Sequence, residues 1–77
     1  MAALVYFRKV AETGRLVTYL FGEDPECLGR RLTVDKESRT STVQDARVDH
    51  TFLKASQKLK VLYAERGAWP ERGMSAS

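Results

Sequence analysis

The stretch that sets the fold is ALVYFRKVAETGRLVTYLF, residues 3–21. It holds two runs rich in Val, Tyr and Phe, which are separated by Glu12, Thr13 and Gly14. Two β-prone runs joined by a short segment with glycine are typical of a β-hairpin. With Thr13 and Gly14 as the loop, Glu12 faces Arg15 across the turn as an opposite-charge pair. The sequence therefore predicts an antiparallel strand pair with this register.

Counting from that turn assigns each strand residue to one of two faces, because successive side chains on a strand point to opposite sides. The residues of one face, which we expect to pack against a helix, are Val5, Phe7, Leu16 and Leu20. The residues of the other face, which we expect to point outward, are Tyr6, Arg8, Val10, Val17, Tyr19 and Phe21. Both faces are apolar, so both need cover.

A third strand is predicted over residues 28–36, where apolar and polar residues alternate. Leu32 and Val34 lie on its apolar side, which Arg30 interrupts near the start. The segment that follows is rich in Ser and Thr and predicts a loop, with a short fourth strand at 40–44 as the alternative.

The spacing of apolar residues becomes helical from Val48 onward. The predicted apolar stripe comprises Val48, Phe52, Ala55, Leu59, Leu62 and Tyr63. Asp45 or Asp49 is suited to cap the N-terminus of this helix, and Arg66 followed by Gly67 is suited to end it.

These elements predict one α+β domain over residues 1–67, a three-stranded or four-stranded antiparallel sheet packed on one C-terminal helix. A chain of 77 residues is too short for a second domain. The segment 68–77 follows the helix stop and is predicted to be a frayed tail.

Cys27 is the single cysteine, so the chain can form no internal disulfide and no cysteine-built metal cage. A reducing compartment, the cytoplasm, is the expected location. The apolar N-terminal start ends at Arg8 and Lys9, too early for a membrane span or a usual signal peptide. We expect no membrane association, no metal and no cofactor.

One helix covers one side of a small sheet, so the second apolar face must meet a partner, unless the register differs or the loop after Lys36 and the tail with Trp69 cover it. The sequence predicts a small non-catalytic interaction module that binds another protein or, most simply, forms a homodimer. The residues predicted to bind the partner are Tyr6, Arg8, Tyr19 and Phe21.

Nucleic-acid binding through the same face is the alternative. The net charge is +3 and the isoelectric point is near 9.3, which favours anionic partners. Aromatic side chains would stack on bases. The residues predicted to contact phosphates are Arg8, Arg30, Arg31 and Lys36.

No residue set amounts to a reaction centre. His50 is the single histidine, and a pairing with Cys27 would need a cleft that a domain of this size seldom has. The acidic cluster Glu23, Asp24 and Glu26 lacks the alternating ligands and central glycine of a calcium loop. We therefore expect no enzyme activity and no small-molecule substrate.

Overall fold

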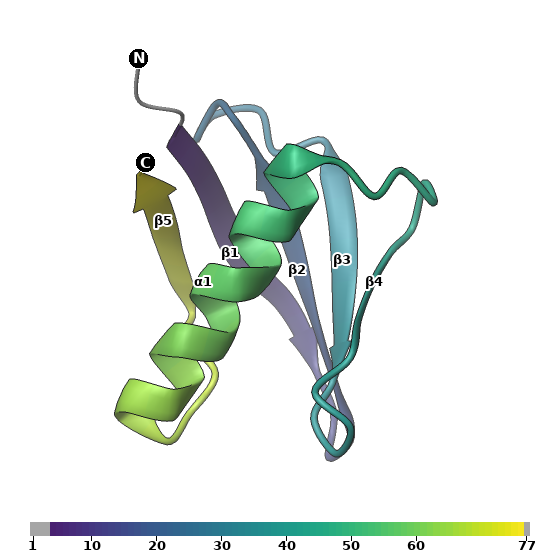
Figure 1. Ribbon diagram of the computed structural model, residues 1–77, viewed down its shortest axis with the longest axis vertical. Helices are drawn as coiled ribbons and strands as arrows, with labels where there is room; N and C mark the ends of the chain where they lie inside the picture. The colour runs from purple at the N-terminus through teal and green to yellow at the C-terminus, as the bar shows by residue number, and fades with distance from the viewer. Residues whose placement is uncertain (1–3, 77) are drawn as a thin grey trace.

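The computed structural model describes residues 4–76, which form an antiparallel sheet with one helix across one face (Figure 1). The elements in chain order are β1 (Leu4–Glu12), β2 (Leu16–Gly22), β3 (Arg30–Asp35), β4 (Ser41–Val43), α1 (His50–Arg66) and β5 (Arg72–Ala76). The strand order is β4-β3-β2-β1-β5, so α1 connects one sheet edge to the other. The predicted α+β fold is confirmed, with the alternative fourth strand present and a fifth strand added.

The β1–β2 hairpin forms as predicted, but its turn lies one residue further along the chain. The backbone N–H of Thr13 donates to the carbonyl of Leu16 at 2.7 Å, so the loop residues are Gly14 and Arg15. The hydroxyl of Thr13 also accepts from the N–H of Leu16 at 2.9 Å. This side-chain bond favours Thr13 as the residue before the loop rather than within it.

A β-bulge at Val10 shifts the register a second time, in the opposite sense. Lys9 consequently pairs with Tyr19, whereas the sequence predicts Arg8 at that position. The net displacement is one residue, and a slip of one residue exchanges the two faces of a strand.

The exchanged face of β2 forms the centre of the core. The sheet residues that are 1% exposed or less are Val5, Phe7, Val17, Tyr19, Phe21, Leu32 and Val34. The prediction that Val17, Tyr19 and Phe21 point outward is therefore wrong. The prediction that Leu16 and Leu20 face the helix is also wrong, because both lie on the opposite face and Leu16 is 41% exposed.

Helix α1 ends as predicted at both termini. The side chain of Asp49 caps the N-terminus by accepting from the N–H of Phe52 at 3.0 Å. Gly67 adopts a left-handed φ of 70° and donates its N–H to the carbonyl of Tyr63 at 2.8 Å. Val48 lies before the helix and is 68% exposed, so its place in the predicted apolar stripe is wrong.

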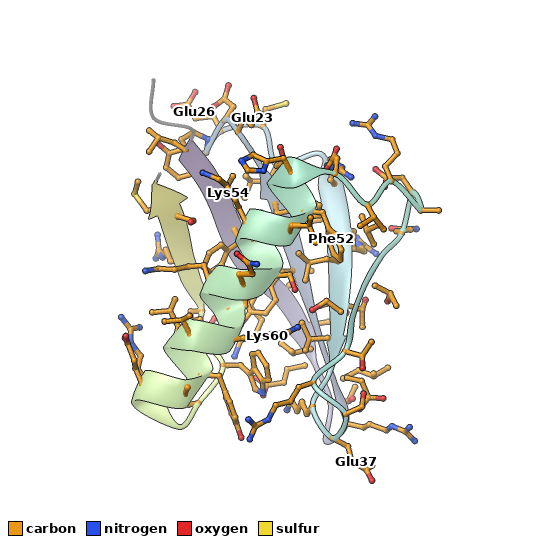
Figure 2. The ribbon with its side chains drawn as sticks, viewed as in Figure 1. Glu23, Glu26, Glu37, Phe52, Lys54 and Lys60 are labelled. Atoms are coloured by element: carbon orange, nitrogen blue, oxygen red, sulfur yellow. The ribbon has the colours of Figure 1, made fainter. Side chains whose placement is uncertain are left out.

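The buried face of α1 lies flat on the sheet (Figure 2). Its core residues are Phe52, Ala55, Leu59 and Leu62. The ring of Phe52 meets that of Phe21 with centroids 6.2 Å apart. Burial of each of the larger side chains, Phe52, Leu59 and Leu62, contributes roughly 1.5–3 kcal/mol to folding.

The segment after the helix is ordered, so the prediction of a frayed tail is wrong for residues 68–76. Trp69 is 7% exposed and stacks on Tyr63 with ring centroids 4.4 Å apart. The hydroxyl of buried Tyr19 donates to the carbonyl of Pro70. The chain then pairs with β1 as β5. Aromatic packing and main-chain pairing thus hold a segment whose own strand propensity is low.

Candidate functional site

The sheet face opposite α1 carries no other helix or strand in the described part of the chain (Figure 1). We call it the outer face. Its apolar side chains, all partly exposed, are Leu4, Tyr6, Leu16, Leu20 and Met74. They lie on β1, β2 and β5, and the charged and hydroxyl side chains of Arg8, Thr18 and Arg72 lie among them.

A row of arginines crosses the outer face at right angles to the strands. Arg72 on β5 pairs with Arg8 on β1, Arg8 pairs with Leu20 on β2, and Leu20 pairs with Arg31 on β3. All three arginines are exposed. With neighbouring strands about 4.8 Å apart, the row spans roughly 14 Å from β5 to β3.

The charge of this row is not neutralised within the described residues. None of the ion pairs there involves Arg8, Arg31 or Arg72. Like charges directly opposite each other on neighbouring strands destabilise a sheet. Asp35, at the far end of the face, is bonded to Arg15. The row therefore forms a positive stripe without an ion-pair partner among residues 4–76, in which Arg8 and Arg72 are like charges directly opposite each other.

A second row, parallel to the first, consists of threonines. Thr18, Thr33 and Thr42 lie side by side on β2, β3 and β4. The hydroxyl oxygens of Thr18 and Thr33 are 3.3 Å apart. These hydroxyls can donate to anionic oxygens.

The loop between β2 and β3 folds over one end of the outer face. Gly22 makes this close approach feasible, because a Cβ there would lie 3.3 Å from the carbonyl oxygen of Cys27. The loop and the β1–β5 pair border an open hollow of about 320 Å³. Its lining includes Tyr6, Arg8, Pro25, Leu28, Arg72 and Met74.

The structure separates the residues predicted to bind a partner. Tyr6 and Arg8 lie on the outer face, and both line the hollow. Tyr19 and Phe21 are fully buried against α1 and reach no surface. The four residues thus form no single patch, because the register of β2 differs from the predicted one.

The predicted phosphate contacts separate in the same way. Arg31 joins Arg8 on the outer face, whereas Arg30 points to the helix side. The guanidinium of Arg30 lies 4.8 Å from the Phe21 ring centroid and bonds Asp45 at 2.9 Å and Asp49 at 2.8 Å. Arg30 therefore binds the two carboxylates that precede α1 and is not part of the arginine row on the outer face.

Lys36 is also engaged elsewhere. Its ammonium donates to Glu12 at 2.6 Å and to the carbonyl of Thr13 at 2.7 Å, beside the hairpin turn. Hydrogen bonds from Lys36 and Lys9 lower the pKa of Glu12 below its ordinary value. Lys36 thus closes the hairpin end rather than extending the positive stripe.

Arg72 is the outer-face residue that the sequence does not reveal. It lies in RGMSA, residues 72–76, which contains no β-branched or aromatic residue. A strand of this composition is recognisable only through its pairing with β1 in the structure.

The charged residues at the N-terminus of α1 make the free energy of unfolding depend on pH in the acid range. Hydrogen bonds from Arg30 and from the N–H of Phe52 lower the pKa of Asp49 to about 2, from an ordinary value of 3.8. Because the folded-state pKa is the lower one, the contribution of this carboxylate is complete above pH 3.8 and is lost as the pH falls towards 2.

An Asp49→Asn variant tests this dependence, because asparagine keeps the capping oxygen and removes the charge. We expect a lower urea midpoint than that of the unmodified chain at neutral pH, and a difference that closes between pH 4 and pH 2. Glu37→Gln, at an exposed position at the far end of the molecule, is the control (Figure 2). A difference that does not change with pH would contradict the assignment.

Other candidate chemistry is sparse. Cys27 is exposed and His50 begins α1. Among residues 4–76, no group of three or more metal-ligating side chains is brought together. No helix in that range is long and apolar enough to cross a membrane. The outer face is therefore the candidate site.

Comparison of the chain with protein-family models, with curated proteins and with solved structures finds no match in any of the three.

Proposed function

We propose that this chain binds nucleic acid through the outer face, with Arg8, Arg31 and Arg72 contacting phosphates. The observation that carries the proposal is the arginine row, which crosses from β5 to β3 without a carboxylate partner among residues 4–76. Phosphate contacts from arginine supply most of the affinity of non-specific nucleic-acid binding.

The direction of the row suits a linear polyanion. A phosphate backbone that runs across the strands passes Arg72, Arg8 and Arg31 in turn. The threonine row lies beside this track and supplies hydroxyl donors of the kind that also contact phosphates. Arginine is suited to this role because its planar fork matches phosphate oxygens.

The same charges disfavour the face-to-face homodimer that the sequence suggests. A two-fold interface applies the same patch to itself, so two arginine rows would approach each other. With Tyr19 and Phe21 in the core, fewer aromatic side chains remain to offset this repulsion. An anionic partner gains from the row, whereas a second copy is repelled by it.

Paired variants test the proposal. We expect the chain to bind a fluorescent oligonucleotide with an affinity that falls steeply as salt rises from roughly 50 to 200 mM. Arg8→Gln with Arg31→Gln should weaken binding and reduce the slope of log K against log salt by about two, since each phosphate contact contributes about one. Fluorescence anisotropy measures both quantities.

Lys60→Gln with Arg66→Gln is the matched control, because it removes two exposed charges from the helix side. This variant should bind as the unmodified chain does. Equal losses in both pairs would show a net-charge effect, and the proposal would fail. A dimer in sedimentation equilibrium that ignores oligonucleotide would favour self-association instead.

A further inference from the structure

We infer that the outer face takes single-stranded nucleic acid and that the hollow beside the β2–β3 loop receives one unstacked base. This inference rests on the proposed function. The residues that carry it are the apolar lining side chains Tyr6, Met74, Pro25 and Leu28, together with Arg8 and Arg72.

The apolar side chains and the arginines occupy successive cross-strand pairs of β1 and β5. Tyr6 pairs with Met74, and two residues further along β1, on the same face, Arg8 pairs with Arg72. Two residues on a strand span about 7 Å. A nucleotide is arranged in the same way, with a flat base whose faces stack on aromatic and apolar groups at one end and a phosphate at the other.

The lining suits a base more than an aliphatic ligand. Tyr6 contributes an aromatic ring to the lining, and Met74, 42% exposed, contributes a polarisable thioether that makes favourable contacts with aromatic rings. Pro25 and Leu28 close the opposite side from the loop. The volume of about 320 Å³ lies at the lower end of the range for small-ligand pockets.

A duplex cannot fill this hollow without breaking its own stack. Bases in a duplex are paired and stacked, so a base enters a pocket only from a single strand or after it is flipped out. The arginine row alone would bind either form. The hollow therefore adds affinity for single strands and none for an intact duplex.

One carboxylate lies close to the expected phosphate position. Glu26, on the β2–β3 loop, lines a neighbouring hollow together with Arg8. Its charge opposes an anion held by Arg8. We therefore expect Glu26→Gln to raise the affinity for single strands, which locates the phosphate on this side of the row.

Three probes of about 12 nucleotides separate bases from phosphates: a thymidine single strand, the same strand with abasic sites, and a duplex. Tyr6→Ala with Met74→Ala should weaken binding of the thymidine strand about tenfold or more, which is the loss expected for one stacked base. The same variant should leave binding of the abasic strand and of the duplex unchanged.

Leu16→Ala is the matched control, since Leu16 is an exposed apolar residue on the same face but outside the hollow. It should bind all three probes as the unmodified chain does, and circular dichroism checks that each variant is folded. Salt-sensitive binding with no preference among the probes would overturn this inference and leave the proposed function standing. No binding to any probe would overturn both.

Discussion

Replacing Tyr19 with alanine should lower the free energy of unfolding by about 3–5 kcal/mol, the range for large aromatic truncations in a core. The Tyr19 side chain is fully buried, and its ring meets that of Phe7 edge to face with centroids 5.8 Å apart. Its hydroxyl donates to the carbonyl of Pro70, so the change also leaves a buried acceptor without its donor. Small domains have total stabilities of about 5–15 kcal/mol, so the variant should lose a large share of its stability and unfold at a clearly lower urea concentration.

Tyr6→Ala is the control for this change, because Tyr6 is the same residue type on the neighbouring strand but lies on the outer face. We expect it to cost about 1 kcal/mol or less. Urea unfolding followed by circular dichroism compares the two variants. If both lost the same stability, the β1–β2 register described above would be incorrect.

The difference between Tyr6 and Tyr19 shows which features of the fold can be predicted from the sequence and which cannot. The two β-prone runs on either side of Thr13 and Gly14 identify both strands of the hairpin, and helical spacing with Asp49 and Gly67 identifies α1. Alternation does not fix register, because Thr13 fits both inside and before the loop. The bulge at Val10 has no local signal, since a valine there also suits a regular strand.

Part of the candidate site can be predicted from the sequence. Arg30 and Arg31 are consecutive in a strand, so they must point to opposite faces and cannot both contact one ligand surface. That rule alone removes one of the four predicted phosphate contacts. It does not select Arg31 over Arg30, because the choice depends on the carboxylates of Asp45 and Asp49, which the fold brings to Arg30.

A chain that ends after Gly67 should show no cooperative unfolding transition. This truncation leaves the domain that the sequence predicts, but it removes core residue Trp69, the Pro70 carbonyl that accepts from Tyr19, and the whole of β5. Loss of a buried tryptophan alone costs about 3–5 kcal/mol, and the ring of Tyr63 loses its stacking partner. Urea titration monitored by circular dichroism tests the expectation. A midpoint equal to that of the full chain would contradict it.

A second truncation, after Glu71, separates the aromatic anchor from the strand. It keeps Trp69 and the acceptor for the Tyr19 hydroxyl but lacks the backbone pairing between β5 and β1. Because those hydrogen bonds exchange with water, their net contribution is about 1 kcal/mol each. We therefore expect this chain to remain folded with a lower midpoint than the full chain. Since it also lacks Arg72, it should bind oligonucleotide with a smaller salt slope, which would tie the order of the C-terminal segment to the charge of the outer face.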